Sequence, residues 1–265
     1  METHFKLIRK TTMRILLGFL ILLSTQFSAA QETDSLKTHK VMLIPYDPRY
    51  YLSDADREIA EQSKLDATRF RAEFRHAIDR NVQRAVRGSY ECISLLNDTA
   101  DILEETMYRV LGRTGFRYEK AIPITPKPLD DDAVVIKTKT TSTKEHEDSK
   151  TASQYIPVKE NAMYMHAVVH KPAELFQELF EQYQTDIFVF ITQMEIKTNY
   201  SSCMDIANKI YRREVMVHFT IYDLQGRLLA GSYATSFFPS NSNNSNKIIG
   251  DCFPDLGRYV AGCLP

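Results

Sequence analysis

Residues 186–238 carry the hydrophobic pattern of three consecutive β-strands, and the rest of the fold is expected to cover or extend them. The stretch 186–196 is apolar almost without a break and rich in β-branched and aromatic residues, which is typical of a strand covered on both faces. The stretch 214–222 alternates apolar and polar residues, which predicts one face on a core and one wetter face. A glycine-containing turn then leads into 227–238 as the third strand. The pattern predicts an antiparallel meander with an irregular connection at 197–211.

Further elements are predicted on both sides of the meander. The short apolar run 40–45, closed by a proline, indicates a buried first strand. A helix capped by Ser53 follows, and its buried stripe recurs every four residues at Phe70, Phe74, Ile78, Val82 and Val86. The expected elements are this long helix over 53–87, a second helix from about Glu91 or Asp98 to Leu111, a strand from Phe116, a strand over 162–169, a helix from Pro172 to Tyr183 and a short tail over 248–265. Together they predict an α/β (α+β) fold, in which a mixed sheet with a C-terminal antiparallel meander packs against two or three helices.

The first 30 residues have the pattern of a signal peptide. Basic residues precede the apolar run 15–23, and small residues at 28–30 suit cleavage after Ala30. A membrane anchor is the alternative, but the stretch 15–27 is shorter than the ~20 apolar residues that span a bilayer. No cysteine directly follows Ala30, so a lipid anchor of the bacterial lipoprotein type is not expected. The mature protein is therefore expected in the periplasm or outside the cell, with no stable membrane span.

The mature chain, 31–265, is expected to form a single α/β domain. Its composition, 43% hydrophobic and 25% charged over the whole chain, is ordinary for a globular protein. The segment 122–160 is rich in Pro, Thr, Lys and acidic residues, which predicts a flexible insertion. Removing residues 1–30 removes four basic residues and Glu2, so the mature formal charge falls from −1 to about −4. This balance does not favour a partner made of nucleic acid.

Four cysteines, Cys92, Cys203, Cys252 and Cys263, lie in the mature chain. An even number of cysteines in an exported protein favours disulfides, and three pairings are possible. Cys252 with Cys263 is the simplest pairing, because it would staple the C-terminal tail. In the alternative, Cys92 lies on a helix as a buried free thiol.

The loop after the first predicted strand is the candidate binding site. It contains Tyr46, Asp47, Arg49 and Tyr50 at the carboxyl end of the strand, where open α/β sheets often place ligand contacts. The alternative is a well-packed aromatic loop without a ligand.

The second half of the long helix is rich in arginine. Its basic residues are Arg69, Arg71, Arg75, Arg80, Arg84 and Arg87. Such a run complements the helix dipole and is typical of a solvated helix face. An anionic ligand bound by these arginines is the alternative.

The sequence contains no motif that assigns a catalytic activity. Walker and dinucleotide loops, a Gly-x-Ser-x-Gly elbow and EF-hand spacing are all absent from it. Asp47, Asp54 and Asp56 could serve a secreted hydrolase as paired carboxylates, but capping and turn roles also explain them. These observations favour a protein that is not an enzyme and that needs no cofactor.

A metal site is a further alternative. His166 and His170 lie on the predicted strand 162–169 or just after it, and Met163 and Met165 lie close by. Soft ligands of this kind could hold a metal in an export compartment. The two histidines would be about 13 Å apart on one strand, which is too far to share an ion.

The order of these elements resembles a family of periplasmic α/β domains. The resemblance rests on Val41–Pro45, the helix end 111–116, the strand at Asp186 and the hairpin with Asp223 and Gly226. The family includes domains of the curli-secretion lipoprotein, the outer-membrane activators of penicillin-binding proteins and the Tol-system β-propeller protein. This chain lacks the lipid-bearing cysteine and the tryptophan after the hairpin, and it carries the insertion. The resemblance implies a non-catalytic interaction module of the cell envelope, whose partner is another envelope protein, and it carries over no site residues.

Overall fold

The structure is a computed structural model of the full chain, and it describes residues 39–96, 101–122, 124, 126–127 and 161–265. Residues His39–Pro265 form a compact unit. The predicted signal peptide and most of the predicted insertion lie outside the described residues.

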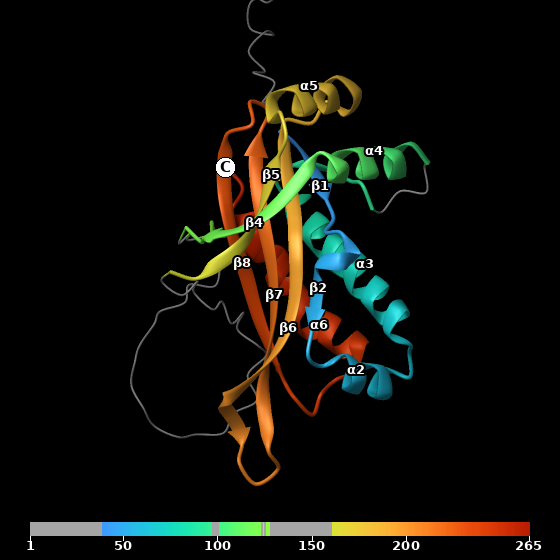
Figure 1. The fold of residues 1–265 in the computed structure, drawn as a ribbon, viewed down its shortest axis with the longest axis vertical. Helices are drawn as coiled ribbons and strands as arrows, with labels where there is room; N and C mark the ends of the chain where they lie inside the picture. The colour runs from blue at the N-terminus through green and yellow to red at the C-terminus, as the bar shows by residue number, and fades with distance from the viewer. Residues whose placement is uncertain (1–38, 97–100, 123, 125, 128–160) are drawn as a thin grey trace, which may run out of the picture. The chain divides into compact units, whose positions relative to one another are not determined.

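A mixed β-sheet forms the centre of this unit, with the strand order β3-β1-β6-β7-β8 (Figure 1). β3 and β6 pair in parallel with β1, β2 also pairs in parallel with β6, and β6, β7 and β8 pair antiparallel. The strands are β1 (Lys40–Ile44), β2 (Tyr51–Ser53), β3 (Glu91–Ser94), β6 (Ile187–Asp205), β7 (Ile210–Asp223) and β8 (Leu228–Pro239). The predicted α/β fold with a C-terminal antiparallel meander is confirmed.

Both faces of the sheet are covered, which is why β1 and the start of β6 are apolar on both sides. Val41 and Leu43 of β1 belong to the core on one face, and Met42 and Ile44 belong to the core on the other. All ten residues of β6 from Ile187 to Ile196 are buried, as the sequence predicts for an interior strand.

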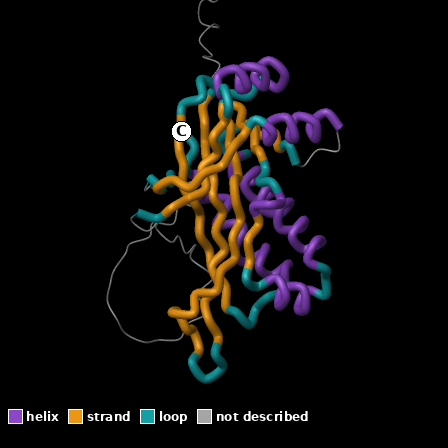
Figure 2. Tube along the Cα trace, in the orientation of Figure 1, coloured by secondary structure: helices purple, strands orange, loops and turns teal. Residues whose placement is uncertain are grey.

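Three helices cover the first face, α2 (Asp56–Ser63), α3 (Ala67–Val86) and α6 (Ser245–Gly262) (Figures 1 and 2). The prediction of a single helix over 53–87 is wrong, because Lys64 takes a left-handed conformation that ends α2. The side chain of Asp66 then accepts a hydrogen bond from the Arg69 amide at 2.9 Å and starts α3. The predicted stripe of α3 is buried on this face.

α6 replaces the short tail that was expected after the meander. Its start is capped by Asn244, whose side chain accepts from the Lys247 amide at 3.2 Å. Glycines and Pro254 lower its helix propensity, so the sequence alone did not predict it. The helix is stable because one side of it is buried against α3 and the sheet.

The second face is covered by two helices and a separate two-stranded antiparallel sheet. These elements are α4 (Asp101–Gly112), α5 (Pro172–Tyr183), β4 (Thr114–Lys120) and β5 (Met163–Val169). Pro172 occupies the first turn of α5, as predicted. The segment 91–94 is a strand rather than the start of the second helix, because it pairs with β1 at the edge of the sheet.

β5 crosses the main sheet over the face of β7 that was expected to be wetter (Figure 1). His218 and Thr220 of β7 accept hydrogen bonds from the backbone amides of Met165 and Ala167, at 3.0 and 3.1 Å. The Tyr222 hydroxyl donates to the Ala167 carbonyl at 2.6 Å. His218 and Thr220 are therefore buried and hydrogen-bonded, so the prediction of a wet face is wrong at these two positions, whereas Glu214 of the same face is partly exposed.

The hairpin of β6 and β7 continues beyond the other strands of the sheet (Figure 1). The connection expected at 197–211 is instead mostly strand, with shifts of register between Asn199 and Cys203 and between Cys203 and Asp205. Its apolar side chains remain exposed, among them Tyr200 and Ile206.

All four cysteines are free thiols in the structure. The pairing of Cys252 with Cys263 is wrong, because Cys252 lies inside α6, Cys263 caps the end of this helix, and a separation of 11 positions spans about 16 Å of helix. Cys92 lies on strand β3 rather than on a helix, and its side chain packs against the core on the first face of the sheet. Cys203 is exposed on the hairpin.

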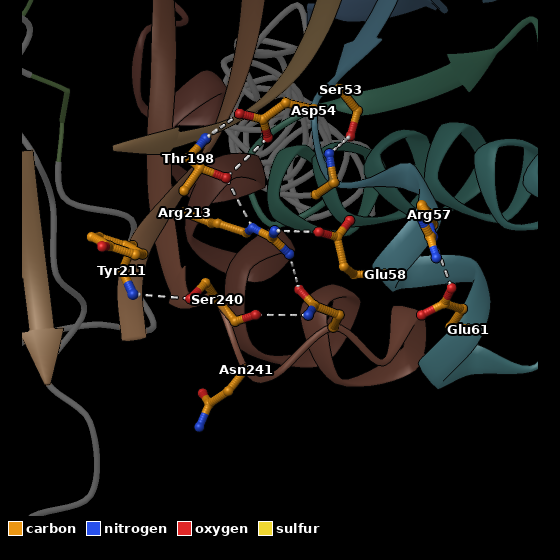
Figure 3. A network of polar contacts seen from close by, with 12 residues as sticks. Ser53, Asp54, Arg57, Glu58, Glu61, Thr198, Tyr211, Arg213, Ser240 and Asn241 are labelled. Atoms are coloured by element: carbon orange, nitrogen blue, oxygen red, sulfur yellow. Dashed lines mark hydrogen bonds and ion pairs between the residues drawn. The ribbon is translucent and has the colours of Figure 1, made fainter. Parts of the chain in front are cut away.

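A polar network around the buried Arg213 connects β7 to α2 and to the turn before α6 (Figure 3). Its guanidinium donates to the Thr198 hydroxyl at 3.0 Å and forms an ion pair with Glu58 at 3.3 Å. It also donates to the side chain of Asn243. Asp54 accepts from the Thr198 amide at 2.8 Å, so this carboxylate attaches the start of α2 to β6.

No helix in the described ranges combines the length and the apolar sequence that crossing a bilayer requires.

Candidate functional site

A pocket lies at the carboxyl end of β1, where the chain leaves the sheet and then returns to it. β1 pairs with β6 up to Phe190, and β2 resumes the pairing at Met194. Between them, residues 45–50 form a loop with a short 3₁₀ turn at Pro48–Tyr50. The pairing of β6 with β7 shifts register between Ile191 and Gln193, beside this loop.

The pocket has a volume of about 370 Å³ and is formed by segments that are distant in the sequence. The loop after β1, one side chain of α3, the second half of α4 and the start of β4 contribute to it. Its lining residues are Asp47, Pro48, Arg49, Tyr50, Arg75, Met107, Tyr108, Leu111, Gly112, Thr114, Gly115 and Phe116. Its size suits a small molecule or one or two residues of a peptide.

Arg75 is the half-buried cation of this pocket. Its Nε donates to the Tyr46 carbonyl at 2.8 Å, and one Nη contacts the Met107 sulfur at 3.5 Å. No carboxylate among the described residues forms an ion pair with it, and burial lowers the pKa of its guanidinium from the ordinary value. The carboxylates of Asp79 and Asp47 lie near enough to raise this pKa, but burial outweighs them, and neither carboxylate contacts the guanidinium directly.

Asp47 and Arg49 form an ion pair at 2.6 Å on the other side of the loop. The Arg49 side chain is mostly exposed, and its hydrogen bonds hold the pKa of the Asp47 carboxyl below its usual value. Asp47 also accepts from the Arg49 amide at 2.9 Å and so fixes the turn. The pair makes the loop rigid and leaves Arg75 as the cation without a carboxylate in contact.

Aromatic rings form the apolar wall. The rings of Tyr50 and Phe116 lie 4.7 Å apart, centroid to centroid, and Tyr108 is exposed at the rim. Gly112 ends α4, and a Cβ at this position would meet nothing within 4 Å. The wall can therefore receive a flat or apolar group.

Three of the four residues proposed from the sequence, Asp47, Arg49 and Tyr50, line the pocket. The side chain of Tyr46 does not line the pocket, because it is buried in the core on the first face of the sheet, with its hydroxyl 3.7 Å from the Met194 sulfur. That these residues bind a ligand stays a prediction.

Sequence reasoning did not single out Arg75. The signal was present in the arginine run of α3, because the position directly after the buried stripe residue Phe74 falls at the edge of the solvated face. Arg69 and Arg71 of the same run pair with Glu73 and Asp56. Arg75 differs from them because α4 and the loop after β1 cover it.

The carboxylates considered for a hydrolase have separate partners. Asp54 accepts from Thr198, and Asp56 pairs with Arg71 and accepts from the Tyr51 hydroxyl at 2.8 Å. Asp47 is held by Arg49. Each of these groups has a structural role.

The methionines and histidines considered for a metal are dispersed. His166 is buried, with its ring nitrogens 2.8 and 3.1 Å from the hydroxyls of Tyr164 and Tyr222. His170 and Met163 are exposed. In the part of the chain that the structure describes, no group of three or more His, Cys, Asp or Glu side chains could hold a metal ion.

No family model and no curated protein matches the chain. Among solved structures, lipoprotein GNA1162 from Neisseria meningitidis is similar at 14% identity, over 80% of this chain and 90% of that chain, with a TM-score of 0.31. A TM-score of this size does not establish a shared fold or function. The resemblance to the periplasmic envelope domains stays a prediction.

Proposed function

We propose that this protein is an exported, non-catalytic binding protein that recognises a partner protein of the cell envelope through the pocket at the end of β1. The observation that carries the proposal is the half-buried guanidinium of Arg75, which faces a cavity of about 370 Å³ without an ion-pair partner among the described residues. A desolvated charge of this kind is costly unless a ligand pairs with it.

Two further observations support the proposal. Asp47, Asp54 and Asp56 are each engaged by an arginine or by a backbone amide, so none of them is positioned as a free general base. The N-terminal sequence predicts export, which agrees with a partner in the cell envelope.

Site-specific crosslinking in cells tests the proposal. A photo-crosslinking amino acid at Tyr108 on the rim of the pocket should capture an envelope protein reproducibly. The same amino acid at Tyr200, which is exposed on the β6–β7 hairpin, is the matched control. Capture from Tyr108 alone supports the pocket as the interface. Capture from Tyr200 alone, or from neither position, would contradict the proposal.

A further inference from the structure

The free donors of Arg75 have a geometry that suits one class of ligand. Its Nε donates a hydrogen bond to the Tyr46 carbonyl, and one Nη group donates to the Met107 sulfur, which is a weak acceptor. Within the described residues, the other Nη donors have no hydrogen-bond partner. Donors at the outer end of a guanidinium match the two oxygens of a carboxylate.

The charge of the pocket favours a monoanion. Its lining contains two arginines and one aspartate, which leaves an excess of one positive charge. One carboxylate neutralises this excess, whereas a phosphate group, with nearly two negative charges at pH 7, would also lie near the Asp47 carboxylate.

The apolar wall indicates what the carboxylate is attached to. Tyr50 and Phe116 form a shelf of two rings, and Met107 and Leu111 of α4 line the same cavity. These side chains would bury an aromatic or large aliphatic group, which supplies affinity that a carboxylate alone lacks.

We infer that the pocket binds a carboxylate attached to an aromatic or large aliphatic group, with Arg75 paired to the carboxylate and the apolar group on the Tyr50–Phe116 shelf. The C-terminal residue of a protein partner and a free aromatic acid share this chemistry. The inference rests on the proposed function of the pocket as a binding site, and it specifies the ligand.

Titration of the purified full-length protein with three probes tests this inference. N-acetyl-L-phenylalanine represents a chain end, 3-phenylpropionate a free acid, and N-acetyl-L-phenylalanine amide lacks the carboxylate. Calorimetry or NMR should detect binding of the two acids with a Kd of about 0.1–1 mM, as expected for ligands of this size. Tighter binding of the acetylated amino acid indicates a chain end, and tighter binding of phenylpropionate indicates a free acid. Binding of the amide as tight as that of the acids, or of none of the probes, would overturn the inference.

Variants locate the binding. Arg75→Gln should weaken binding of the acids about 10- to 100-fold, since it removes a charge-assisted pair. Arg80→Gln changes an exposed arginine of the same helix that does not line the pocket, and affinity should not change. If Arg75→Gln disturbs folding, Gly112→Leu is the second test, because the new side chain extends into open space and should obstruct the pocket. Undiminished binding by a folded Gly112→Leu protein would place the probes elsewhere.

The two proposals fail separately. If a partner is captured at Tyr108 and Arg75→Gln does not change its binding, the interaction function stands and the inference of a carboxylate ligand is refuted. Carboxylate binding without any captured protein refutes the protein partner and retains the ligand.

Discussion

Gly257 of α6 lies against the backbone of Asn81 in α3, where a Cβ at position 257 would stand 2.7 Å from the Asn81 carbonyl carbon and oxygen. Real Cβ atoms do not approach a backbone so closely, so the two helices pack at a distance that only glycine permits. This contact sets the position of α6 on the first face of the sheet.

Gly257→Ala should therefore destabilise the protein, by about 1–3 kcal/mol, because α3 and α6 must move apart. The matched control is Gly250→Ala in the same helix, where an added Cβ would meet nothing within 4 Å. That change should be neutral or stabilise by up to about 1 kcal/mol, since alanine favours helix. Urea unfolding followed by circular dichroism measures both. Equal effects of the two substitutions would contradict the close approach at Gly257.

Arg213 should contribute to stability through the network shown in Figure 3. It is 5% exposed, and Arg213→Met leaves Asn243 and Thr198 without its donors. We expect a loss of about 2–3 kcal/mol in the free energy of unfolding. Arg57→Met is the control, because the ion pair of Arg57 with Glu61 is exposed and should contribute less than about 0.5 kcal/mol. A loss at Arg213 as small as that at Arg57 would show that the network is dispensable.

His218 should make the protein sensitive to acid. Burial, and to a lesser extent the charge of Lys197, lower its pKa in the folded protein to about 3, although the carboxylate of Glu195 lies 3.7 Å from its Nε2. Glu195 is already paired with Lys197 and accepts from Gln193, so we expect burial to dominate. The unfolded chain binds a proton at this residue below pH ~6.5, whereas the folded protein does not. The contribution of His218 to the free energy of unfolding is therefore complete above pH ~6.5, and it falls by about 1.4 kcal/mol per pH unit between pH ~6.5 and pH 3.

His218→Asn tests this dependence, since asparagine can accept from the Met165 amide but does not titrate. The unfolding free energy of this variant should vary less steeply between pH 6.5 and 4 than that of the parent protein. His170→Asn changes an exposed histidine, and the steep slope should remain. If His218→Asn keeps the full slope, other groups cause the acid sensitivity.

The cysteines should differ in reactivity. Burial raises the pKa of Cys92, Cys252 and Cys263 to about 12, so almost no thiolate forms at pH 8. Cys203 is exposed. A thiol reagent such as Ellman's reagent should modify one cysteine rapidly in the native protein, and the other three only on unfolding.

Cys203→Ser should abolish the rapid phase and leave the slow one. A denatured, unreduced sample that yields fewer than four thiols would show that disulfides form in the protein.

The sequence alone determined the elements whose pattern is local. The unbroken apolar run of β6, the alternation of β7 and the four-residue stripe of α3 are each set by which neighbours face a core, so their periods identify them. The loop after β1 was also identified, because a proline after a buried strand marks where the chain leaves a sheet.

Only the tertiary structure decided the features that depend on contacts between distant residues. α6 is a helix in spite of Pro254 because its buried side packs on α3 and the sheet, and His218 and Thr220 are buried because β5 crosses them. The pocket likewise depends on α4 covering Arg75, a contact that no local period encodes. Packing free energy outweighs local propensity in each of these places, and it acts between segments whose pairing the sequence does not display.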